Sequence, residues 1–128
     1  MLKLPSLGEM DRGVPVRIWL RVGPTDMRKG FDTLAAVVRE FLGQDPLSGQ
    51  LFLFVSRNRT RLKILYWDAD GYALWYKRLE EGTFRLPRTD GERAGVELKA
   101  SELAMMLEGI DLRSVKRTKR FRRVVHEV

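Results

Sequence analysis

Three strand-like segments with short links, all within residues 51–79, constrain the fold of this chain more than any other feature. The first, residues 51–55, is apolar at every position, which is typical of a strand covered on both faces. Residues 62–67 and 72–79 follow, and the sequence Asp-Ala-Asp-Gly at 68–71 favours a tight turn between them. Because short links join antiparallel neighbours, we expect a meander. Eight of the twelve aromatic residues lie in or just after it, where they are expected to build the core and one sheet face.

A strand and a helix are expected before this meander. Apolar and polar side chains alternate over residues 16–22, which predicts a half-buried strand. Apolar side chains then recur at helical spacing over residues 31–42. Thr25 or Asp26 is the expected N-terminal cap of this helix, and Gly43 is the glycine expected at its C-terminal end.

The segment after the meander predicts a further short strand and a second helix. Residues 96–99 have strand character, and a helix is expected from Ala100 or Ser101 to Gly109. Residues 83–87 are one more candidate for strand pairing. These elements assign the chain to the α+β class, with a strand and helix, an antiparallel aromatic meander, a short C-terminal helix and a basic tail.

Length and composition predict one domain with two flanking segments. A chain of 128 residues is long enough to bury one core but a tight fit for two domains. We expect an irregular leader at residues 1–15, the domain at residues 16–110 and a mobile basic tail at residues 111–128. Since no apolar run approaches about 20 residues and the start lacks a secretory signal, a cytoplasmic protein is expected.

The excess of positive charge lies mostly in the tail. The chain carries 24 Lys and Arg against 17 Asp and Glu, and seven of those cations but only two of those acids lie in residues 111–128. The tail cations are Arg113, Lys116, Arg117, Lys119, Arg120, Arg122 and Arg123. Such an arm attracts a polyanion without fixed geometry, so DNA is the expected partner. The alternative is a solvated tail that only maintains solubility.

A second set of cations lies in the meander and is a candidate nucleic-acid-binding surface. Its members are Arg57, Arg59, Arg61, Lys63, Lys77 and Arg78. The first four occupy alternate positions, so an extended backbone would place their charges in one row along a phosphate backbone. Solvated surface at a hairpin tip is the alternative interpretation.

Arg28 and Lys29 are a candidate anion-binding pair. They fall in the expected first turn of the helix, where the helix dipole disfavours cations. A bound anion would explain them, and so would pairing with a neighbouring carboxylate such as Asp26 or Asp32.

Few residues are available for catalysis. The absence of cysteine excludes disulfides, thiolate zinc sites and cysteine nucleophiles, and the one histidine, His126, lies at the chain end. Asp90, Glu97 and Lys99 have the residue types of a metal-dependent nuclease, but this pattern arises easily in a chain so rich in charge. The Asp68–Gly71 segment lacks the later ligands of a calcium loop. We therefore expect no enzyme, no catalytic residue, no metal and no cofactor.

Several motifs together resemble one family. They are Asp-Met-Arg-Lys-Gly-Phe-Asp at 26–32, Asp-Pro-Leu-Ser-Gly at 45–49, Leu-Tyr-Trp-Asp-Ala-Asp-Gly at 65–71, Leu-Trp-Tyr-Lys-Arg-Leu-Glu at 74–80 and Leu-Glu-Gly-Ile-Asp at 107–111. Over roughly residues 16–111 the chain resembles the TnpB-type accessory protein, the second small reading frame, of the insertion-sequence group numbered sixty-six among bacterial transposable elements.

The resemblance implies a non-catalytic role in DNA transposition. It implies a separate, larger transposase that carries the strand-transfer chemistry and is encoded by the same element. Contact with DNA through the basic surface and tail is then the expected activity. The alternative is an adaptor that docks on the transposase through its aromatic sheet face, with Trp19 or Trp75, and has no DNA contact of its own.

Overall fold

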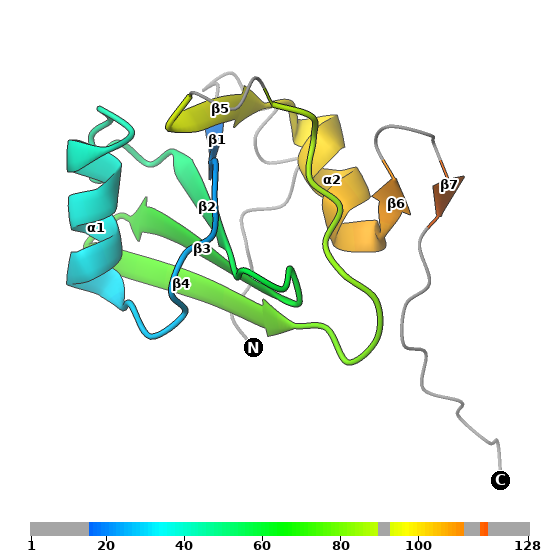
Figure 1. Ribbon diagram of the computed structural model, residues 1–128. Helices are drawn as coiled ribbons and strands as arrows, with labels where there is room; N and C mark the ends of the chain where they lie inside the picture. The colour runs from blue at the N-terminus through cyan, green and yellow to red at the C-terminus, as the bar shows by residue number, and fades with distance from the viewer. Residues whose placement is uncertain (1–15, 90–92, 112–115, 118–128) are drawn as a thin grey trace, which may run out of the picture.

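A five-stranded mixed sheet between two helices forms the body of the protein, as seen in a computed structural model that describes residues 16–89, 93–111 and 116–117 (Figure 1). In chain order, the strands and helices of this body are β1 (Ile18–Arg21), α1 (Phe31–Glu40), β2 (Leu51–Val55), β3 (Arg61–Asp68), β4 (Gly71–Arg78), β5 (Gly95–Leu98) and α2 (Ala100–Glu108). The strand order is β4-β3-β2-β1-β5. The expected α+β class is confirmed.

The strand pairing explains this order. β2, β3 and β4 are consecutive antiparallel neighbours, as the short links between residues 51 and 79 predict. β1 pairs with β2 in parallel, because α1 carries the chain back to the same end of the sheet. β5 returns from the far side of the meander and pairs antiparallel with β1. That last pairing joins segments distant in sequence, and local patterns do not encode it.

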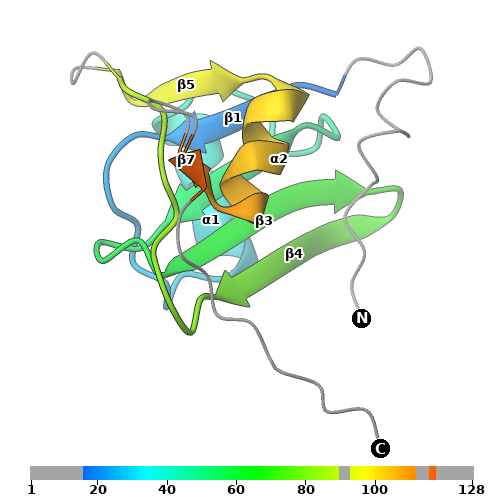
Figure 2. The same ribbon diagram turned by 90° about the vertical axis from the view of Figure 1, so that its right-hand side faces the viewer.

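The two helices cover opposite faces of the sheet (Figure 2). On one face, Leu34 and Val38 of α1 pack with Phe52 and Phe54 of β2, all fully buried. On the other, Leu103 and Met106 of α2 pack against a larger set of sheet residues, together with Phe84. The aromatic side chains are therefore divided between both faces, where one aromatic sheet face was expected.

β1 shows the alternation expected of a half-buried strand: Ile18 and Leu20 are buried, whereas Trp19 and Arg21 are only partly buried. Ile18 and Leu20 face the core beneath α2, as the alternation predicts. Trp19, on the opposite face, packs against the cluster beneath α1, and its indole Nε1 donates a hydrogen bond of 2.7 Å to Gln50. β5 pairs along the edge of β1 opposite β2, so β1 is an inner strand of the sheet.

The expected start of the first helix is also wrong. α1 begins after Gly30, which caps it without any side-chain hydrogen bond. Asp26 instead accepts a hydrogen bond of 2.9 Å from the backbone N–H of Arg28, which closes a local turn before the helix. The C-terminal glycine is confirmed: Gly43 has a φ of 63°, and the next N–H donates to the carbonyl of Val38 at 3.2 Å.

The second helix begins and ends where the sequence predicts. The side chain of Glu102 accepts a hydrogen bond of 2.9 Å from the N–H of Lys99, and Gly109 ends the helix with a φ of 83°. Neither α1, with ten residues, nor α2, with nine, could cross a membrane. Residues 83–87 form no strand; one backbone hydrogen bond, from the N–H of Phe84 to the carbonyl of Arg59, ties this segment to the sheet end.

A two-residue ladder follows α2. β6 (Ile110–Asp111) pairs antiparallel with β7 (Lys116–Arg117). The ladder crosses the boundary that the sequence suggests between domain and tail. Residues 1–15, 112–115 and 118–128 lie outside the described residues, so the expected leader and most of the expected tail cannot be placed.

Candidate nucleic-acid interface

The link between β2 and β3, residues 56–60, is a side-chain-braced turn that we call the basic turn. The Oδ1 of Asn58 accepts hydrogen bonds of 2.8 Å from the hydroxyls of both Ser56 and Thr60. The Ser56 hydroxyl oxygen in turn accepts from the N–H of Arg61 at 3.0 Å. Arg59 occupies the left-handed region, with a φ of 60°. The backbone is therefore folded back here, and the cations from 57 to 63 do not lie in the single row that an extended segment would give.

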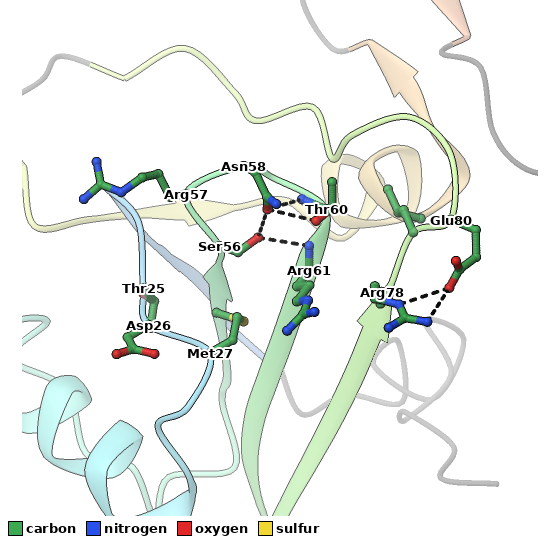
Figure 3. A pocket seen from close by; sticks show the side chains of 11 residues that line it. Thr25, Asp26, Met27, Ser56, Arg57, Asn58, Thr60, Arg61, Arg78 and Glu80 are labelled. Atoms are coloured by element: carbon green, nitrogen blue, oxygen red, sulfur yellow. Dashed lines mark hydrogen bonds and ion pairs between the residues drawn. The ribbon is translucent and has the colours of Figure 1, made fainter.

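The four cations of that expected row differ in their surroundings and in how far they are exposed. Arg57 is exposed on the turn and reaches toward the segment around Thr25 (Figure 3). Arg59 lines a further hollow, which also contains Arg57. Arg61 is exposed at the start of β3. Lys63 lies on the same face of β3 but is 6% exposed.

The buried ammonium of Lys63 is held by contacts within the protein. Its Nζ donates hydrogen bonds of 2.7 Å to the carbonyl of Met27 and 2.8 Å to the carbonyl of Lys29. The same ammonium lies 4.7 Å from the centre of the Tyr76 ring, within the range of a cation–π contact. Lys63 therefore joins the segment before α1 to the sheet, and a phosphate could reach it only by breaking these bonds.

Arg61 and Arg78 lie directly opposite each other on β3 and β4 (Figure 3). The neighbouring pair is hydrogen-bonded, since the N–H of Leu79 donates to the carbonyl of Thr60 at 2.7 Å. Alternation along an antiparallel ladder makes the Arg61–Arg78 pair the non-hydrogen-bonded kind, in which side chains approach more closely. Lys77 points to the opposite face of the sheet, so only Arg78 of the expected pair joins this surface.

Three adjoining hollows connect the basic turn to its surroundings, and together we call them the basic groove. The central one has a volume of about 580 Å³ (Figure 3). It shares Thr25, Asp26 and Arg57 with one neighbour and Arg61, Arg78 and Glu80 with the other. The charged residues that line the groove are Arg21, Asp26, Arg28, Lys29, Arg57, Arg61, Arg78 and Glu80.

The groove keeps an excess of unpaired positive charge. Its two carboxylates are each bound to an arginine, Asp26 to Arg28 at 2.7 Å and Glu80 to Arg78 at 2.9 Å. The other four cations have no carboxylate partner within the described part of the chain. They are Arg21, Lys29, Arg57 and Arg61.

Arg28 and Lys29 precede the helix by one turn and do not lie in its first turn. Hydrogen bonds from Arg28 lower the pKa of Asp26 to about 2, so this carboxylate is charged across the physiological range. The pairing with Asp26, which the sequence left as the alternative to a bound anion, is observed for Arg28. Thr25, beside it, is 4% exposed, and its buried hydroxyl has no hydrogen-bond partner among the residues described.

The nuclease-like residues are engaged in other contacts. The carboxylate of Glu97 accepts two hydrogen bonds from Arg17, at 3.0 and 2.6 Å, and this pairing lowers the pKa of Glu97. Lys99 is the N-cap residue of α2, and Asp90 lies outside the described residues. Within the described ranges, no three His, Cys, Asp or Glu residues gather closely enough to hold a metal ion.

The turn between β3 and β4 differs from the basic turn. Asp68 pairs directly with Gly71, so two residues close the hairpin, and Ala69 has a φ of 52°. The rings of Trp67 and Tyr72 pack edge to face behind it, 5.1 Å apart. The turn that the Asp-Ala-Asp-Gly sequence predicts is confirmed.

Sequence reasoning missed part of the groove. Asn58 was not among the predicted site residues, although its side chain accepts the hydrogen bonds that shape the basic turn. Tyr76 was expected in the core or on a sheet face, yet it is 47% exposed beside Arg61. Its position just before Lys77 and Arg78, at the end of a strand, was the available signal.

The fold and groove define a small α+β protein with a concave basic surface at one end of its sheet. The model of the family described as "IS66 Orf2 like protein" matches residues 16–117, and the chain belongs to this family. Membership makes the chain an accessory protein of an IS66-type transposition system, as the motifs predict.

Two curated relatives match most of the chain. The "Uncharacterized protein y4hO" of Sinorhizobium fredii (strain NBRC 101917 / NGR234) is 39% identical over 109 residues, which cover 85% of this chain and 93% of the relative. The "Uncharacterized protein y4jC" of the same strain is 35% identical over 103 residues, covering 80% and 86%. No solved structure matches the chain.

Proposed function

We propose that this protein is a non-catalytic accessory factor for transposition that contacts DNA phosphates through the basic groove. The groove is the first contact surface, and the basic tail at residues 111–128 supplies a second set of cations. Phosphate contacts of this kind give affinity and position but no sequence readout, so no base-reading role is assigned to the cations.

One observation carries the proposal: the sheet places Arg61 directly opposite Arg78. Like charges opposite each other on a sheet face destabilise the pair. Glu80 offsets the charge of Arg78, whereas the guanidinium of Arg61 meets no carboxylate among the described residues and donates a hydrogen bond of 3.4 Å to the Tyr76 hydroxyl. A phosphate between the two guanidinium groups would offset this repulsion with charge-assisted hydrogen bonds.

Two further features support the same surface. Arg57 extends the positive charge from this pair to the segment before α1, and no described carboxylate neutralises it. The buried hydroxyl of Thr25, next to Arg57 on the groove wall, is a donor that a phosphate oxygen could satisfy after a side-chain rotation.

The test is the salt dependence of DNA binding. The double variant Arg57→Gln/Arg61→Gln is compared with wild type by fluorescence anisotropy on a labelled duplex over a salt series. If each arginine meets one phosphate, the slope of log K against log salt falls by about two units, since each contact contributes roughly 0.9. An unchanged slope would contradict the proposal.

A matched control keeps the change in net charge the same. Arg39 on α1 and Arg88 in the loop after β4 are exposed and do not line the groove. The double variant Arg39→Gln/Arg88→Gln should retain nearly the wild-type slope. If both double variants lose affinity equally, net charge alone governs binding.

The tail is tested separately, by removing residues 112–128. Seven cations lie in that segment: Arg113, Lys116, Arg117, Lys119, Arg120, Arg122 and Arg123. If each met a phosphate, the truncated chain would show a slope shallower by about six units. Binding of the transposase with no binding of DNA at any salt would favour the adaptor function over DNA contact.

A further inference from the structure

Tyr76 is an exposed aromatic side chain set among cations, and the DNA-binding proposal does not use it. It lies on β4, on the sheet face that also carries Arg61, Lys63 and Arg78. It is 47% exposed, whereas Tyr66, the other tyrosine in mid-strand, is 4% exposed. Tyr76 therefore keeps nearly half of its surface in water although it lies within a strand.

One side of the Tyr76 ring is already occupied. The ammonium of Lys63 lies 4.7 Å from the ring centre, held there by two carbonyls. The hydroxyl is bound at the edge, where the Nη1 of Arg61 donates to it at 3.4 Å. These contacts fix the ring, and because Lys63 occupies one face, a stacked group would have to use the face turned away from Lys63. A fixed ring with one open face loses little entropy when a flat group stacks on it.

The surroundings match an unpaired nucleotide. The smallest hollow of the basic groove, about 330 Å³, is lined by Tyr76, Arg61, Arg78 and Glu80. It adjoins the central hollow, so a strand whose phosphates lie along the groove would bring a base to the ring. Proteins that bind single-stranded nucleic acid combine such a cationic path with aromatic rings on which bases stack.

We infer that Tyr76 is a stacking platform for an unpaired base of single-stranded DNA whose backbone lies in the basic groove. The inference rests on the proposed DNA contact and adds the form of DNA. Inside a duplex both faces of every base are covered by neighbouring bases, so a duplex could use the cations but not the ring. The protein should therefore prefer single strands, or duplexes with opened ends, over intact duplex.

The experiment compares Tyr76→Leu, Tyr76→Phe and wild type in the full chain. Binding to a labelled oligothymidine strand is measured at several salt concentrations. Loss of one stacked base should weaken binding by Tyr76→Leu about 5- to 150-fold. The salt slope should stay unchanged because no phosphate contact is lost. Tyr76→Phe keeps the ring and should bind within about threefold of wild type.

Two further arms use the same proteins. On an intact duplex, Tyr76→Leu and wild type should bind alike. On an abasic strand with the same number of phosphates, wild type should lose the affinity that Tyr76→Leu loses on oligothymidine. Circular dichroism shows whether Tyr76→Leu folds. If it does not, the affinities of wild type for oligothymidine and for the abasic strand still measure the contribution of base stacking.

The outcomes separate the two proposals. Equal binding of oligothymidine and the abasic strand by wild type, or an unaffected Tyr76→Leu, overturns the stacking site while phosphate contact stands. Loss of duplex binding by Tyr76→Leu as large as its loss of single-strand binding also overturns it, since stacking cannot act there. Failure of wild type to bind any DNA contradicts both proposals.

Discussion

The two hairpin turns at opposite ends of β3 differ in how they are held and in what surrounds them. The turn at Asp68–Gly71 is closed by two residues, carries two carboxylates and lines none of the hollows of the basic groove. The basic turn is longer, is braced by side-chain hydrogen bonds to Asn58 and lies against the segment before α1. Charged residues occur at both turns, but only those of the basic turn line the basic groove.

Charged residues form a binding surface only where the fold brings other segments of the chain beside them. At the basic turn, those neighbours come from residues 24–29 and 78–80, which are distant in sequence from residues 56–61. Lys63 holds the first of these segments in place through the carbonyls of Met27 and Lys29. The groove therefore depends on a buried cation that does not line it.

Removing that cation should give the largest effect. Lys63→Met keeps the length of the side chain but leaves two carbonyls without their donor, so we expect the free energy of unfolding to fall by about 2 kcal/mol. Urea unfolding measures it. Lys77→Met, on the exposed side of β4, is the control and should change stability by less than about 0.5 kcal/mol. Equal stability of Lys63→Met and wild type would show that the two carbonyls find other partners.

Removing the brace of the basic turn should give a smaller effect. Asn58→Ala deletes the acceptor of three hydrogen bonds on an exposed turn, and we expect a loss of about 1 kcal/mol by urea unfolding. The matched change in the other turn is Asp70→Ala, which removes no hydrogen bond that holds that turn and should be nearly neutral. Equal losses at the two turns would remove the distinction between them.

Each turn also contains one non-glycine residue with a positive φ, Arg59 at 60° and Ala69 at 52°. Ala69→Gly should raise the free energy of unfolding by about 0.5 kcal/mol, because relief of left-handed strain exceeds the added chain entropy. Arg59→Gly should stabilise the protein similarly, as thermal unfolding would show. Destabilisation by either substitution would mean that the side chain, not the backbone, determines the turn.

The smallest effect concerns acid titration at the groove. Because Arg28 donates hydrogen bonds to Asp26, the pKa of Asp26 is lowered to about 2. A lowered pKa means that the stabilising contribution is present above the ordinary aspartate pKa near 4 and is lost as pH falls from about 4 to about 2. Arg28→Gln should raise the Asp26 midpoint toward 4, measured by carbon-detected NMR. If the midpoint does not move, the hydrogen bonds from Arg28 are not the cause of the lowered Asp26 pKa.

The sequence predicts the local elements of the fold well and its distant pairings poorly. The meander, both helix ends at Gly43 and Gly109, and the Asp68–Gly71 turn follow from spacing and turn chemistry. The pairing of β5 with β1 does not, since it depends on the path of the whole chain.

The same limit applies to the groove. Alternation predicted a row of cations from Arg57 to Lys63, but the hydrogen bonds of Asn58 favour a turn within that segment. The burial of Lys63 could not be predicted either, because its two acceptors are carbonyls some 34 and 36 positions earlier in the chain. Charges are visible in a sequence, whereas their partners become visible only in three dimensions.

The most direct test of the account is to observe which amides respond to DNA. In a ¹⁵N-labelled full chain titrated with an oligonucleotide, we expect the chemical-shift changes within residues 16–110 to be concentrated at residues 25–29, 56–61 and 78–80, with none at residues 68–71. Changes concentrated at residues 68–71 or over α2, or none at any DNA concentration in dilute buffer, would contradict it.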